Sequence, residues 1–288
     1  MHAASALPGR LPLMAVNAGA AGAVRDCRTM RAASNPEADI DTALLVTCEH
    51  AGKRVPAEYR ELFAGQDALL DTHRGWDPGA LVLAREMAKA FDAPLFYTET
   101  TRLLIDANRS IGSPELYSEF TKPLPAAARR DIVERHYRPH REPIVAWVRD
   151  TIAAGRKVVH IASHSFTPEL NGVVRTADVG FLYDPRRPGE VELCDRWHAA
   201  LRHAMPELRL RRNYPYLGNS DGLCFRLRKT CAASVYVGVE LEVNQAFARA
   251  GGKPWTRIRR GLIDSMRVAL EARDAPRRRR AARCRVAA

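Results

Sequence analysis

Two histidines stand at the points where apolar, strand-like runs break off. His50 follows the run 43–47, and His164 follows the run 158–162. Aliphatic runs of this length are typical of strands that are buried on both faces of a parallel sheet. In open α/β sheets, ligands bind beyond the carboxyl ends of such strands. The two imidazoles are therefore placed to share one metal ion at that edge of the sheet.

A hydrolytic metal site commonly combines two imidazoles and one carboxylate with an open position for water. Asp77 is our candidate for the carboxylate, because it opens the helix expected over residues 80–91, which follows the His50 strand. Asp77 precedes a proline, so it also has the pattern of a helix N-cap. His73 and Asp71 lie in the same segment and remain alternatives for the third ligand.

Two glutamates follow another apolar run, 235–239, near the end of the domain. A metal ion lowers the pKa of a bound water, and a general base must then move a proton from that water to the leaving amine. Glu240 and Glu242 differ by two positions, so they share one strand face if the chain stays extended. We prefer Glu242 as the base and keep Glu240 as the second choice.

Two arginines flank the short apolar run 103–105, for which we predict a strand. Arg109 has Asn108 beside it, and a guanidinium can grip a carboxylate through two parallel hydrogen bonds. Arg102 is placed to polarise a scissile carbonyl and to stabilise the oxyanion. Both arginines also have a simpler interpretation as partners in surface salt bridges.

The elements that would position these residues alternate between strands and helices, which favours one α/β domain with a mainly parallel central sheet. The 288 residues are enough for a full hydrophobic core. We expect strands at residues 43–47, 94–97, 103–105, 158–162, 181–183 and 235–239, and helices at 80–91, 126–154 (interrupted by two prolines), 190–204 and 255–271.

We assign residues 39–274 to this domain. The Ala- and Arg-rich residues 1–38 are expected to form a disordered N-terminal extension, and the arginine-rich residues 275–288 a disordered basic tail. Much of the formal net charge of +12 lies in that tail. The body of the chain has no interleaved basic and aromatic pattern, so we expect no specific nucleic-acid partner.

The remaining composition is that of an ordinary soluble protein. The six cysteines form no C-x-x-C pair, which argues against a zinc ribbon and a disulfide framework and favours the reducing cytoplasm. No apolar stretch reaches the roughly 18 to 20 residues that span a bilayer, so no membrane partner is expected. His136 and His140 have metal-compatible spacing, but they lack the acid of an H-E-x-x-H motif. We expect them to pack, as we do for His160 inside its strand.

Together these residues resemble the N-formylglutamate amidohydrolase family over residues 44–247. The matching blocks are 48–52, 71–73 with Asp77, 102–109, 213–218 and 240–244. Each block is short, and the resemblance is carried by their order and spacing together. The family is similar to zinc carboxypeptidases and aspartoacylases, which implies a three-layer, phosphorylase/hydrolase-like α/β fold.

The resemblance implies a role for each residue singled out above. The zinc ligands would be His50, Asp77 and His164. Asn108 and Arg109 would bind the substrate carboxylate, Arg102 would steady the carbonyl oxygen, and Glu242 would be the catalytic acid–base. In carboxypeptidases the carboxylate ligand lies three residues after the first histidine, where this chain has Lys53. The role of Asp77 therefore rests on topology and not on local spacing.

The sequence thus predicts a zinc-dependent amidohydrolase that cleaves a small N-acyl amino acid with a free carboxylate. N-formyl-L-glutamate, giving formate and L-glutamate, is the leading substrate, which implies a role in histidine catabolism. Another divalent metal is compatible with the same ligands. The alternatives are a zinc amidase or peptidase of the same fold with a different acyl or peptidyl substrate, and a non-catalytic binding paralogue. The sequence leaves the oligomeric state open.

Overall fold

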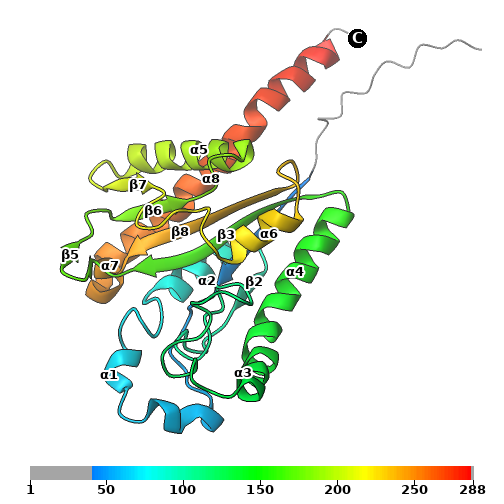
Figure 1. The fold of residues 1–288 in the computed structure, drawn as a ribbon. Helices are drawn as coiled ribbons and strands as arrows, with labels where there is room; N and C mark the ends of the chain where they lie inside the picture. Colours follow the sequence, from blue (N-terminus) through cyan, green and yellow to red (C-terminus); the bar gives the residue numbers. More distant parts are fainter. Residues whose placement is uncertain (1–40, 287–288) are drawn as a thin grey trace, which may run out of the picture. The chain divides into compact units, whose positions relative to one another are not determined.

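The computed structural model describes residues 41–286, so the extension expected over residues 1–38 lies outside the described part. The described residues form an α/β domain of three layers, with helices on both faces of one central sheet (Figure 1). The predicted fold class is confirmed.

The central sheet has six strands in the order β2-β1-β3-β8-β6-β7. Neighbouring strands are parallel, except that β6 runs antiparallel to β8. β4 and β5 form a separate small hairpin. The strand bounds are β1 Thr42–Cys48, β2 Leu95–Tyr97, β3 Lys157–Phe166, β4 Glu169–Leu170, β5 Val173–Val174, β6 Val179–Leu182, β7 Leu210–Arg212 and β8 Tyr236–Asn244.

The helices fall into two layers (Figure 1). One face of the sheet is covered by α2 (Ala80–Ala90), α5 (Pro188–Ala204) and α8 (Gly252–Val286), and the other by α4 (Arg138–Ala153) and α6 (Leu223–Thr230). The shorter elements are η1 (Ala57–Phe63), α1 (Asp67–Leu70), α3 (Ala126–Ile132), the π-helical turn η2 (Val133–Tyr137) and α7 (Gln245–Ala250).

The side chains of β3 and β8 alternate between these two layers. Val159 and Ile161 join the core beneath α2, α5 and α8, whereas Val158 joins the core beneath α4 and α6. With a period of two, His164 lies on the same face as Val158. It pairs with Glu242 across the β3–β8 ladder. The second predicted histidine and the preferred base therefore lie side by side on one face of the sheet.

Both central strands extend beyond their predicted ends. β3 continues to Phe166 and β8 to Asn244, so His164 and Glu242 lie within strands and not in the loops that follow them. Pairing between β3 and β8 continues through these last residues, and this pairing keeps both strands extended beyond their apolar runs. Polar residues at a buried strand end break the apolar pattern that identifies a strand in the sequence.

Residues 103–105 do not form the predicted strand. They lie in turns, where the Leu104 N–H donates to the Thr101 carbonyl at 3.0 Å. Their side chains are buried in a second apolar cluster with Phe63 and Ile132. The apolar run thus reflects burial within the long connection between β2 and α3, and not pairing in the sheet.

The last helix, α8, continues past residue 271, its predicted end, to Val286. Its backbone is therefore helical across residues 275–286, for which the sequence predicts a disordered tail. Alanine and arginine both have high helix propensity, which allows the helix to continue. No helix within residues 41–286, α8 included, is both long and apolar enough to cross a bilayer.

His160 packs at the centre of the sheet, as predicted. It is fully buried, with Nε2 2.8 Å from the Thr47 hydroxyl and Nδ1 2.8 Å from the Tyr236 hydroxyl. Burial lowers the pKa of His160 to about 4. The fold therefore requires a neutral imidazole at this position.

This pKa makes His160 a source of acid instability. In the unfolded chain the imidazole has its ordinary pKa of 6.5, whereas in the folded chain it stays neutral down to about pH 4. The stability that depends on the neutral imidazole is fully present above pH 6.5. About 3 kcal/mol of it is lost as the pH falls from 6.5 to about 4. Urea denaturation measures the free energy of unfolding of the wild type and of His160→Gln. The difference between the two proteins should fall by this amount between about pH 7 and pH 4. A difference that does not change with pH would contradict this prediction.

Candidate metal centre

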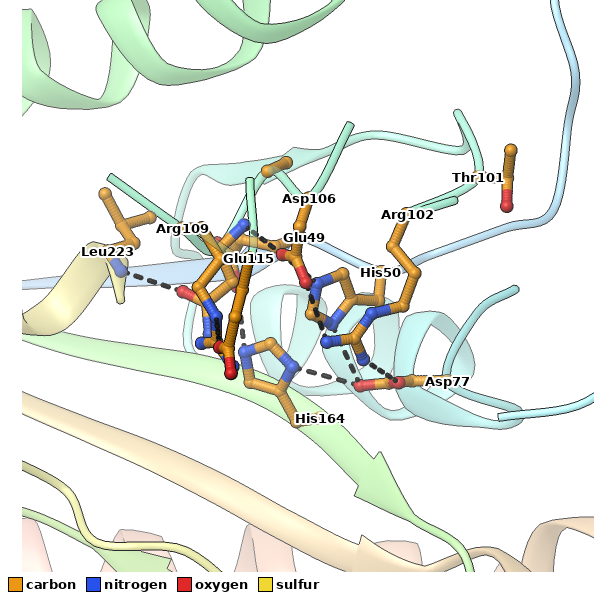
Figure 2. Close-up of polar contacts among 12 residues, drawn as sticks. Glu49, His50, Asp77, Thr101, Arg102, Asp106, Arg109, Glu115, His164 and Leu223 are labelled. Atoms are coloured by element: carbon orange, nitrogen blue, oxygen red, sulfur yellow. Dashed lines mark hydrogen bonds and ion pairs between the residues drawn. The ribbon is translucent and has the colours of Figure 1, made fainter. Parts of the chain in front are cut away.

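His50, Asp77 and His164 converge at the carboxyl-terminal edge of the parallel strands, and all three are buried. One ligand atom from each lies within 4.8 Å of the other two. The Oδ2 atom of Asp77 is 3.4 Å from His50 Nδ1 and 3.0 Å from His164 Nδ1 (Figure 2). The centroids of the two imidazole rings are 5.1 Å apart. The structure thus brings together the three residues that the sequence predicts as ligands.

The local chain explains why the Asp77 carboxylate is available. The sequence predicts it as the N-cap of α2, but Gly79 holds that position and no side chain caps the helix. Gly79 has a φ of 86°, a left-handed conformation that glycine adopts without strain. The Asp77 N–H donates to the His50 carbonyl at 3.0 Å. The N-cap prediction is therefore wrong, because the carboxylate turns toward the imidazoles and away from the helix end.

Each imidazole is held between two carboxylates. His50 turns Nδ1 toward Asp77 and Nε2 toward Asp106, whose Oδ1 is 2.7 Å away. His164 turns Nδ1 toward Asp77 and Nε2 toward Glu49, whose Oε2 is 3.0 Å away. A carboxylate on the outer nitrogen of a metal-binding histidine fixes its tautomer and its ring orientation. The two Nδ1 atoms are therefore the candidate ligand atoms.

Glu49 has no signal of its own in the sequence beyond its place next to His50. It is 1% exposed and lies between His164 and His140, whose Nε2 is 3.7 Å from Oε1 of Glu49. Burial alone would raise the pKa of Glu49, but the two imidazoles outweigh it and hold this pKa well below its usual range. These are ion-pair contacts, since neither Glu49 oxygen has an aligned hydrogen bond within the described residues. His140 packs as predicted, but against a charged group of the site.

Arg102 joins the same cluster. Its guanidinium nitrogens lie 2.8 Å from Asp106 Oδ2 and 3.4 Å from Asp77 Oδ1. Burial would raise the pKa of Asp77, but His50, His164 and Arg102 hold it well below its usual range. Asp77 is therefore ionised, as a metal ligand must be.

The charge balance of the cluster fits a divalent cation. The carboxyl groups buried here belong to Glu49, Asp77, Asp106, Glu240 and Glu242. A buried carboxylate is costly unless it is paired, and Glu49 and Asp77, whose pKa values are held below their usual range, are both ionised here. Two imidazole nitrogens and a carboxylate oxygen are donors typical of catalytic zinc. The residues present therefore suit zinc or a similar divalent ion.

Glu242 and Glu240 lie on one face of β8 and line a cavity together with the metal-site residues. Burial, together with the charges of Asp77 and Glu240, raises the pKa of Glu242 to about 8. Burial also raises the pKa of Glu240. Glu242 is therefore able to exchange a proton near neutral pH, which a general acid–base must do.

The cavity has a volume of about 380 Å³. Its walls include every predicted site residue: His50, Asp77, Arg102, Asn108, Arg109, His164 and Glu242. His73 also lines it but is not part of the three-residue cluster. Asp71 is exposed and forms an ion pair with Lys53. Among the alternatives weighed for the third ligand, Asp77 is thus the one that contacts both imidazoles.

Asn108 and Arg109 line the cavity, and each already has hydrogen-bond partners within the protein. Asn108 Oδ1 accepts a hydrogen bond from the Leu223 N–H at 2.8 Å. Arg109 donates from Nε to Glu115 at 2.7 Å and from Nη1 to the Asp221 carbonyl at 2.9 Å. A substrate carboxylate that binds Nε of Arg109 would therefore have to displace Glu115.

Known proteins resemble this chain over the whole domain. The profile of the N-formylglutamate amidohydrolase family matches residues 42–248. A solved gene product of Agrobacterium tumefaciens is 30% identical, with a TM-score of 0.70, and the match covers 82% of this chain and 93% of that protein. A solved N-formylglutamate amidohydrolase of Ralstonia eutropha JMP134 is 18% identical, with a TM-score of 0.60, and the match covers 83% and 96%; this likeness shows a shared fold. Among curated proteins there is no match.

The three-residue cluster predicts one tightly bound divalent ion per chain. Wild-type protein dialysed against metal-free buffer should retain about one equivalent of metal, whereas His50→Ala and His164→Ala, which each lose a ligand, should retain less than about a tenth of it. His198→Ala is the matched control, because it removes a half-buried histidine on α5. Plasma mass spectrometry measures the metal content. Equal metal content in all four proteins would contradict the assignment.

Proposed function

The chain belongs to the N-formylglutamate amidohydrolase family, and we propose from this membership that it hydrolyses the amide bond of an N-acyl amino acid in a metal-dependent reaction. The family itself indicates a hydrolase. Zinc as the metal, and N-formyl-L-glutamate as the substrate that yields formate and L-glutamate, are the finer part of the proposal.

One observation supports the proposal most strongly. His50, Asp77 and His164 meet in a cavity that is also lined by the buried carboxyl group of Glu242. Metal-dependent hydrolysis of an amide needs a Lewis acid, a nucleophile and a group that moves protons within the same few ångströms. The cavity supplies the ligands of a metal ion, which would serve as the Lewis acid and activate the water nucleophile, and a carboxyl group that can move protons.

His50, Asp77 and His164 would hold the ion. When bound, zinc acts as a Lewis acid and makes water nucleophilic at neutral pH. Glu242 would accept a proton from the attacking water and pass it to the nitrogen of the leaving amine. A pKa of about 8 suits a carboxyl group that must both accept and return a proton near neutral pH.

The cationic residues would bind and orient the substrate. Arg109, with Asn108 beside it, would hold the carboxylate of the amino acid through charge-assisted hydrogen bonds. Arg102 is anchored by Asp106, and its side chain remains 26% exposed at the cavity. Its guanidinium is therefore available to the carbonyl oxygen, where negative charge develops during attack.

Replacing Glu242 with Gln preserves the size of the side chain and removes the proton acceptor. We expect kcat for N-formyl-L-glutamate to fall by about 10²- to 10⁴-fold, the usual loss when general acid–base catalysis is removed. Metal content should not change. Steady-state kinetics and metal analysis of the same preparation measure both quantities.

Glu240→Gln is the matched control, because Glu240 lies on the same face of β8 and lines the same cavity. A larger loss of kcat in Glu240→Gln than in Glu242→Gln would transfer the role to Glu240. Normal turnover in both variants would contradict acid–base catalysis by this pair.

Glu115 should act as a competitor of the substrate for Arg109. The Glu115 side chain is 69% exposed, and such an ion pair is worth at most about 1 kcal/mol. Glu115→Gln should therefore lower KM by up to about fivefold and leave kcat unchanged. Glu119→Gln, which removes a comparable exposed pair with Arg74, serves as the control. A KM that is unchanged or that rises in Glu115→Gln would contradict competition between Glu115 and the substrate for Arg109.

A further inference from the structure

Arg175 is a buried arginine that the proposed mechanism does not use. It follows β5 of the small hairpin, and its backbone N–H donates to the Pro168 carbonyl at 2.8 Å. The residue is only 9% exposed. A guanidinium this deeply buried needs a partner for its charge.

The protein itself supplies no such partner within residues 41–271, where no carboxylate lies at ion-pairing distance from Arg175. The arginines that line the active-site cavity do have carboxylate partners, in the pairs Arg102–Asp106 and Arg109–Glu115, and Arg74 of a second cavity pairs with Glu119. Arg175 therefore differs from them in carrying a charge that its surroundings leave unbalanced.

The guanidinium of Arg175 lies against the wall of the active-site cavity. Its Nη1 atom donates to the Tyr216 hydroxyl at 3.1 Å. Its carbon lies 5.0 Å from the ring centroid of Tyr216 and 6.0 Å from that of Phe166. Both aromatic side chains line the active-site cavity, and Tyr216 also lines an adjoining cavity of about 420 Å³.

The Tyr216 hydroxyl extends this positive site to the cavity surface. Because its oxygen accepts a hydrogen bond from Arg175, its own hydrogen is available to another acceptor. Tyr216 is 46% exposed, so such an acceptor can approach from the cavity. His73, which also lines the cavity, lies in the same positive field: burial lowers the pKa of His73, and the charges of Arg102 and Arg175 lower it further.

We propose that Arg175 and Tyr216 form a second anion subsite, which binds a substrate carboxylate in addition to the one held by Arg109. Tyr216 donates its hydroxyl hydrogen to this carboxylate, and Arg175 supplies the balancing charge. The inference rests on the proposed function and narrows it to N-acyl amino acids with two carboxylates. The second carboxylate can come from the side chain of the amino acid or from the acyl group.

Two pairs of substrates, each differing by one carboxylate, separate these sources. N-formyl-L-glutamate is compared with N-formyl-L-glutamine, and N-succinyl-L-alanine with N-butyryl-L-alanine. In at least one of the two pairs, the kcat/KM of the wild type should be about tenfold or more higher for the dicarboxylate. Arg175→Met, which keeps much of the buried stem, should reduce that preference to about threefold or less. Arg74→Met removes an arginine already paired with Glu119 and should leave the preference intact.

A preference that survives in Arg175→Met overturns the subsite, as does a wild type that turns over these substrates without preferring either dicarboxylate. Circular dichroism checks that the variant folds. If it does not, Tyr216→Phe loses only the hydroxyl and must show the reduced preference instead; a full preference there overturns the subsite as well.

A wild type that hydrolyses none of the four substrates counts against the proposed function and not against the subsite. Calorimetry then compares glutarate with butyrate on the full-length protein. Tighter binding of glutarate that disappears in Arg175→Met supports the subsite, and equal binding of the two acids by the wild type overturns it.

Discussion

The crowding of carboxylates around two buried imidazoles is the constraint on which the rest of the site depends. Asp77 Oδ2 lies near Nδ1 of both His50 and His164, while Asp106 and Glu49 take the outer nitrogens. Like charges repel strongly where water is excluded, so this arrangement requires positive charge among its members. The same contacts that create this requirement also fix the ring orientations that a metal needs. The contacts that make a cation necessary are therefore the same contacts that prepare the site to bind one.

The sheet brings these groups together by strand order and register. β1, β3 and β8 are parallel neighbours, so their carboxyl ends meet at one edge, where ligands bind in open α/β folds. Along β8, one face is apolar throughout, while the other carries Glu240 and Glu242 toward that edge, beside His164 of β3. The long connection after β2 then adds Arg102 and Arg109 to the lining of the cavity. Strands β3 and β8 thus carry His164 and Glu242, the segments after β1 and before α2 carry His50 and Asp77, and the connection after β2 carries the arginines that would meet the substrate.

The sequence pattern was enough to predict the parallel sheet and the convergence of His50, Asp77 and His164. Aliphatic runs mark buried strands, and the polar residues that end these runs mark the edge of the sheet where ligands bind. The pattern was insufficient where contacts between distant segments decide the outcome. Residues 103–105 look like a strand, yet tertiary packing buries them in turns. Glu49 matters only because the fold sets it against an imidazole from β3. No local pattern contains that information.

The most direct test of the metal centre is the position of the ion itself. Crystals of zinc-loaded protein, measured on both sides of the zinc absorption edge, should show an anomalous peak at about 2.0–2.2 Å from Nδ1 of His50, Nδ1 of His164 and a carboxylate oxygen of Asp77. The Nε2 atoms should remain on Asp106 and Glu49. A peak held by other residues, ligation through Nε2, or no peak at this edge of the sheet would contradict the metal centre described above.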